Sequence, residues 1–258
     1  MSDEDQEIDV SPRALLREVI LCAAALTLWP LLKDDARGSA QDRMRALAMA
    51  PLIGLAVGVI LAGLDGAMAP VMPLGMRSIA VLLVAFALML GLPMRGIADT
   101  TEAIRRGARV GATGISGIGP VGAAAALGAF ALEAVILARI ASPAGRASAL
   151  VMAQMLGRFA IVPAAYGLKP LERWGLGLPY EIGVTFREFA ASSIIALGLT
   201  TILYRNVGLI VVIVFAIVIL LMRLVFSRRL GGVAGYTLGG ASAVAEIAVM
   251  ATVGALTR

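Results

Sequence analysis

Long apolar runs separated by short polar stretches dominate the chain. The strongest runs cover residues 47–64, 79–92, 121–141, 147–166, 190–204, 207–226 and 238–256. An α-helix needs roughly 20 apolar residues to cross a bilayer, and about 17 are enough where neighbours assist. The runs are continuous rather than alternating, which is typical of helices and not of a membrane β-barrel. The pattern therefore predicts seven membrane-spanning helices.

A weaker apolar run covers residues 15–32. Arg17 and Glu18 interrupt it early, and Pro30 closes it. It is either an eighth span or an amphipathic helix that lies at the membrane interface. We expect an all-α fold, a polytopic membrane helical bundle of seven or eight helices in a single domain over 13–258.

The first ten residues carry five acids. A secretory signal peptide begins with positive charge, so this start does not resemble one. We expect residues 1–12 to form a short, solvated acidic tail on the cytoplasmic side.

Composition supports a membrane protein and excludes several kinds of catalytic site, metal site and cross-link. The chain is 60% hydrophobic and 15% charged, whereas soluble domains average about 25% charged residues. It has no histidine, which excludes a Ser-His-Asp triad and histidine-ligated metals. Its single cysteine excludes an internal disulfide. The net charge is +5, and most charged residues lie between the apolar runs. This distribution indicates membrane topology rather than nucleic-acid binding.

The basic residues are distributed asymmetrically between alternate loops. Loops 33–45, 93–120, 167–188 and 223–237 together hold 14 Lys and Arg, and the intervening segments hold five. Because basic loops stay on the cytoplasmic side, we expect these four loops to be cytoplasmic and the C-terminus to face away. The predicted location is the cytoplasmic (inner) membrane, with the lipid bilayer as the first partner.

Loop 93–120 carries the strongest candidate chemistry. It is rich in glycine and holds two acids, Asp99 and Glu102, which would share a face of a helix. Its arginines are Arg95, Arg105, Arg106 and Arg109. Arginines beside glycine-rich backbone favour phosphate binding, and a carboxylate pair could hold Mg²⁺ between phosphates. The alternative is a flexible loop whose arginines meet lipid headgroups.

Few charges lie well inside the predicted spans; they are Glu133, Arg158 and Glu246. A charge inside the membrane is costly unless it is paired, so each should face the bundle interior. Glu133 is expected to pair with Arg139 or with Arg158.

Four segments resemble motifs of the cobalamin synthase family, adenosylcobinamide-GDP ribazoletransferase. They are PLIGLAVG at 51–58, RGIADTTEA at 95–103, GRF at 157–159 and LGGVAGYTLGGASAVAE at 230–246. The resemblance implies a membrane enzyme that joins α-ribazole or its phosphate to adenosylcobinamide-GDP, with Mg²⁺, and releases GMP. It implies that Asp99 and Glu102 hold the metal and act in catalysis. The residues implied for phosphate binding are Arg105, Arg106, Arg109 and Arg158.

Several motif positions depart from the family pattern. Pro93 replaces the motif histidine, Arg95 replaces the first aspartate, and Tyr236 replaces a later one. Glu133 replaces a lysine, and Glu246 is the one acid left of a later pair. These substitutions reverse or remove charge, which predicts an altered or lost activity.

Three functions remain open from the sequence. The first is a working ribazoletransferase that uses Mg²⁺ and corrinoid substrates. The second is a non-catalytic relative, either a subunit of a larger membrane complex or a binder of lipid, pigment or corrinoid. A transporter is the third, but the runs at 121–141 and 147–166 lack the charged relay expected of a coupled carrier.

Overall fold

The structure is a bundle of helices. The computed structural model describes residues 16, 18–23, 45–107, 119–171 and 183–257. The elements are η2 (Leu47–Met49), α3 (Ala50–Met68), α4 (Leu74–Leu88), α5 (Leu92–Arg106), α6 (Pro120–Arg139), α7 (Pro143–Ala165), α8 (Phe186–Val225), η4 (Phe226–Leu230) and α9 (Gly235–Leu256). Over these residues the all-α prediction is confirmed, since no strand longer than an isolated bridge is present.

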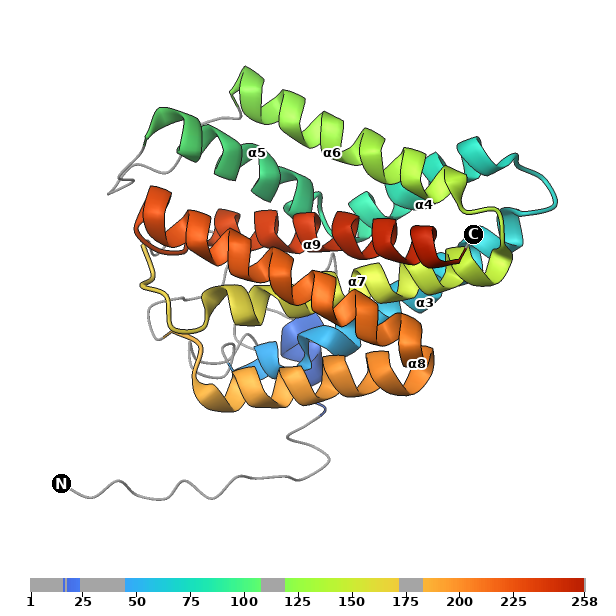
Figure 1. The fold of residues 1–258 in the computed structure, drawn as a ribbon. Helices are drawn as coiled ribbons and strands as arrows, with labels where there is room; N and C mark the ends of the chain where they lie inside the picture. The colour runs from blue at the N-terminus through green and yellow to red at the C-terminus, as the bar shows by residue number, and fades with distance from the viewer. Residues whose placement is uncertain (1–15, 17, 24–44, 108–118, 172–182, 258) are drawn as a thin grey trace.

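Helices α7 and α9 occupy the middle of the bundle (Figure 1). Within their most apolar windows, 78% of α7 and 67% of α9 are buried, against 17% of α6 and 22% of α8 with η4. The peripheral helices are the more apolar ones, because lipid tails accept leucine and isoleucine as readily as a protein core does. The central helices can therefore carry polar side chains that face one another.

Glycines allow the central helices to approach closely. A Cβ atom on Gly54 of α3 would lie inside 3.0 Å of the Gln154 backbone on α7, and one on Gly58 would meet Val151 in the same way. Gly96 of α5 has a similar contact with Gly240 of α9. Small residues at helix crossings maximise van der Waals packing where lipid offers no hydrophobic driving force.

Helix α8 reverses direction at Arg205. This residue has φ 45° and ψ −121°, which no helix interior adopts. Gly208 packs against the carbonyl oxygen of Thr200, although residues eight apart in a straight helix are about 12 Å apart along its axis. Figure 1 shows the two halves running antiparallel. The predicted runs 190–204 and 207–226 are these two halves.

Five of the described helices are long and apolar enough to cross a membrane, with α8 and η4 taken together as one. The pair α4 and α5 is bent by 82° and makes a sixth if it counts as one span. The bend lies at Leu90 and Gly91, which both have positive φ. The seven predicted runs thus fall into six helical units, because two of them share α8.

Two segments expected as loops contain helices in their described residues, which for 93–120 exclude 108–118, and this corrects the prediction. Loop 93–120 begins as α5, and loop 223–237 contains the end of α8, the π-helix η4 and the start of α9. In both, charged residues at helical spacing lower the hydropathy without interrupting the helix. The tail 1–12, most of 15–32 and of 33–45, and residues 172–182 of loop 167–188 lie outside the described residues.

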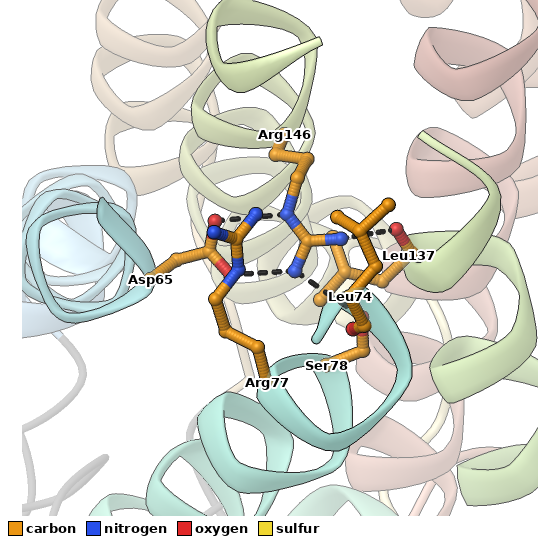
Figure 2. A network of polar contacts seen from close by, with 6 residues as sticks. All are labelled: Asp65, Leu74, Arg77, Ser78, Leu137 and Arg146. Atoms are coloured by element: carbon orange, nitrogen blue, oxygen red, sulfur yellow. Dashed lines mark hydrogen bonds and ion pairs between the residues drawn. The ribbon is translucent and has the colours of Figure 1, made fainter. Parts of the chain in front are cut away.

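Arg77 and Arg146, two of the five basic residues in the segments between the predicted cytoplasmic loops, are buried in an ion network (Figure 2). Arg146 of α7 is completely buried and donates to Asp65 of α3 through Nε (2.8 Å) and Nη2 (2.5 Å). It also donates to the Leu137 carbonyl oxygen (2.6 Å) and to Ser78 Oγ (3.2 Å). Arg77 Nε lies 3.1 Å from Asp65 Oδ1. The network joins α3, α4, α6 and α7 at one end of the bundle.

Candidate functional site

The structure separates the predicted site residues into two groups. The first group lies on α5 and comprises Arg95, Asp99, Glu102, Arg105 and Arg106. The second lies among α6, α7 and α9 and comprises Glu133, Arg158 and Glu246. Arg158 is thus not brought to the α5 arginines, and Arg109 lies outside the described residues.

The α5 group is positioned by a helix with defined ends. Gly91 precedes the helix and Gly107 follows it, and both adopt the left-handed conformation that glycine tolerates. Gly96 sets α5 directly against α9. Thr100 Oγ1 donates a hydrogen bond to the carbonyl oxygen of Tyr236 at the start of α9 (3.2 Å). Tyr236 therefore meets α5 through its backbone.

Asp99 is engaged by an arginine of its own helix. Arg95 Nε lies 3.4 Å from Asp99 Oδ2, one helical turn away. The Asp99 side chain is 11% exposed and that of Arg95 is 68% exposed. The guanidinium thus covers the carboxylate from the solvent side.

Glu102 pairs with two arginines of its own helix, whereas Asp99 pairs with one. Its side chain is 1% exposed, and Oε1 accepts hydrogen bonds from Arg105 and from Arg106 Nε (2.9 Å). The chain passes so close at Gly119 that a Cβ atom there would meet the carboxylate. Oε2 is buried and has no hydrogen-bond partner among the described residues.

This donor set does not fit a protein-held divalent cation. Mg²⁺ binds through carboxylate oxygens that face the ion, whereas both α5 carboxylates already face guanidinium groups. Across the described ranges, no group of three acidic or cysteine side chains that could hold a metal ion is found. Three guanidiniums against two carboxylates leave the α5 group with one excess positive charge. The group is suited to contact an anion.

The second group forms a buried polar cluster in the bundle interior. Arg158 Nη1 donates to Ser242 Oγ (2.6 Å) and lies 3.1 Å from Glu246 Oε1. Arg158 Nη2 donates to Gln154 Oε1 (3.2 Å), and Gln154 Nε2 donates to Glu246 Oε2 (2.9 Å). Glu246 Oε1 also accepts from Ser242 Oγ (3.2 Å). The cluster ties α7 to α9.

Glu133 of α6 borders the same cluster without joining its ion pairs. It lines a cavity of about 20 Å³ together with Gln154, Arg158 and Glu246. The expected pairing of Glu133 is wrong, because in the described part of the chain Arg158 pairs with Glu246 and no ion pair of Glu133 is formed. The cause is geometric, since α7 and α9 are in closer contact than α6 is with either.

Sequence reasoning missed Gln154 and Ser242, which complete the cluster. A signal for both was present. Gln154 precedes Arg158 by four residues and Ser242 precedes Glu246 by four, so each lies one helical turn from a charged side chain.

The sequence model of the family described as cobalamin-5-phosphate synthase matches residues 18–254. The chain belongs to this family. Three relatives are named adenosylcobinamide-GDP ribazoletransferase. Those of Roseiflexus sp. (strain RS-1), Geotalea daltonii and Clostridium acetobutylicum are 29%, 27% and 26% identical to this chain.

The alignments cover 78%, 84% and 88% of this chain and 76%, 88% and 91% of the relatives, in the same order. No solved structure matches the chain significantly. The resemblance read from four short motifs is thus confirmed for the cobalamin-5-phosphate synthase family, and the match includes both the α5 group and the interior cluster.

Proposed function

We propose that this member of the cobalamin-5-phosphate synthase family binds a phosphate-bearing corrinoid through the arginines of α5 and does not catalyse magnesium-dependent transfer. The relatives' name supplies the ligand, adenosylcobinamide-GDP, whose pyrophosphate is anionic. The arginine side chains supply the complementary charge directly, where the family resemblance implies a metal ion.

One observation carries the proposal. Both acids of the 95–103 motif, Asp99 and Glu102, are paired with arginines of their own helix. The best placed of these arginines is Arg95, because it is 68% exposed and has a single ionic contact at 3.4 Å. Only Nε of Arg95 contacts Asp99, so the other N–H groups of its exposed guanidinium can donate to a phosphate oxygen while that contact is kept.

The proposed site lies at the end of the bundle that the charge asymmetry assigns to the cytoplasm. Helix α5 ends there with Arg105 and Arg106, and the basic residues Arg228 and Arg229 of η4 lie at the same end (Figure 1). A cytoplasmic position gives the site access to a soluble nucleotide-linked substrate, and we place the protein in the cytoplasmic membrane.

The experiment measures binding and turnover separately on the detergent-purified protein. Isothermal titration with adenosylcobinamide-GDP, with and without EDTA, is expected to show binding that EDTA does not weaken. A charged hydrogen bond contributes about 1.5–3 kcal/mol, so Arg95→Gln should weaken binding roughly tenfold or more. Arg228→Gln, an exposed arginine of the same end, is the matched control and should leave the affinity unchanged.

The turnover assay distinguishes our proposal from the second candidate function, a magnesium-dependent ribazoletransferase. That candidate is favoured by the relatives' name and by Glu102 Oε2, which is buried without a partner in the described residues. Cobamide formation from adenosylcobinamide-GDP and α-ribazole that requires Mg²⁺ and is lost in Asp99→Asn would establish it and refute our proposal.

A non-catalytic subunit without a small ligand gives a third outcome. In that case neither binding nor turnover is measurable, and a second membrane protein copurifies in mild detergent. This result would also refute binding by the α5 arginines.

A further inference from the structure

The interior cluster carries an unbalanced charge. Glu133, Arg158 and Glu246 are between 3% and 5% exposed, and they comprise two carboxylates and one guanidinium. Arg158 forms an ion pair with Glu246, in which Nη1 lies 3.1 Å from Oε1. No ion pair of Glu133 is formed among the described residues, although Arg158 lines the same cavity. A buried carboxylate without an ion pair of its own costs several kcal/mol, so a positive species bound beside Glu133 would stabilise the fold.

Apart from Arg158 and Glu246, no described side chain that lines the cavity beside Glu133 is charged. The cavity walls contributed by α4 and α5 are apolar and include Leu82, Phe86, Pro93 and Met94. The polar lining comes from Glu133 itself and from Gln154, Arg158 and Glu246 on α7 and α9. The missing positive charge is thus not supplied by any described element that lines the cavity.

Two buried polar atoms beside the cavity indicate which ligand it can hold. Glu133 Oε1 and Arg158 Nε are both buried and have no hydrogen-bond partner among the described residues. One is an acceptor and the other a donor. The cavity of about 20 Å³ between their residues holds about one water molecule. A water that accepts from Arg158 Nε and donates to Glu133 Oε1 would satisfy both atoms.

We propose that Glu133, Arg158 and Glu246 form a proton-binding site in the membrane interior, in which Glu133 carries the proton and one water links it to Arg158. A proton fits better than a metal cation, because a metal cation needs several oxygen ligands and one wall of this small cavity is apolar. The site is independent of ligand binding at α5, since it shares no residue with that group.

Infrared spectroscopy of the detergent-purified protein tests the proposal. At neutral pH the wild type is expected to show the carbonyl band of a protonated carboxylic acid, which shifts in D₂O. Glu133→Gln should abolish the band. Glu188→Gln is the matched control, because Glu188 is a buried carboxylate of α8 that binds Thr185 instead, and this variant should keep the band.

Charge balance also predicts a substitution that increases the infrared band instead of abolishing it. Arg158→Gln removes the positive charge, so Glu246 should take up a proton as well and the band should grow about twofold. Absence of the band in the wild type, its loss in Glu188→Gln or its survival in Glu133→Gln would overturn the proposal. Thermal stabilisation by Na⁺ relative to choline at equal ionic strength would also overturn it, because the site would then hold a metal cation.

Discussion

The Asp65 network offers the sharpest test of how the bundle is held together. Asp65 is the one anion between two arginines, and Arg146 is completely buried. Asp65→Asn keeps the shape of the side chain but leaves two guanidiniums facing each other at the junction of α3, α4 and α7 (Figure 2). Breaking a buried ion pair by removing one partner costs about 3–5 kcal/mol.

Thermal unfolding in detergent, followed by circular dichroism, measures this cost. A free-energy change of 1 kcal/mol shifts Tm by roughly 2–4 °C in a chain of this size, so Asp65→Asn should lower Tm by roughly 10 °C. Ser78→Ala is the matched control within the same network. It removes the hydrogen bond from Arg146 (3.2 Å) and the one to the Leu74 carbonyl oxygen (2.7 Å), each of which contributes about 1 kcal/mol.

A double variant separates the charge effect from a packing effect. Asp65→Leu with Arg146→Met removes one charge of each sign, so the excess of one positive charge in the network stays as in the wild type. It should be milder than Asp65→Asn alone. The reasoning is refuted if Asp65→Asn is no worse than Ser78→Ala, or if the double variant is as unstable as the single one.

Three further predictions follow from close contacts and from topology. Gly96→Ala should lower Tm, because its Cβ would press on the Gly240 backbone and push α5 from α9; Gly198→Ala, which meets no atom within 4 Å, should not. Gly208→Ala should likewise lower Tm by separating the two halves of α8 at Thr200, and an effect equal to that of Gly198→Ala would contradict the hairpin. Cysteines placed at Gly107 and at Thr257 should react with an impermeant maleimide from opposite sides of the membrane, the first from the cytoplasm, and labelling from one side only would contradict the topology.

Much of the architecture followed from hydropathy alone. Each apolar run of sufficient length became a helix because the membrane leaves a backbone few ways to satisfy its hydrogen bonds. The break between 190–204 and 207–226 was visible as the polar pair Arg205 and Asn206. What hydropathy could not show was helix α5, because its charged residues resemble a loop when only composition is considered.

The candidate site was predictable in parts. The motif on 95–103 identified Asp99 and Glu102, and both lie on one helix as their spacing indicated. The pairing of these acids with Arg95, Arg105 and Arg106 followed the three- and four-residue spacing of a helix surface, but rotamers decide which of several neighbours is bound. The phosphate-binding role of Arg158 came from the family resemblance, and the structure shows that its guanidinium pairs with Glu246.

The sequence by itself determined the class of protein, the helices and the family, because these depend on local hydropathy and on short motifs. The tertiary structure decided which charges meet. Asp65 and Arg146 are 81 residues apart, and Gln154 and Glu246 are 92 apart, so no local pattern could pair them. In the interior of a membrane bundle a charge has few neighbours, and the packing of distant helices determines whether it finds a partner or, like Glu133, is left without one among the described residues.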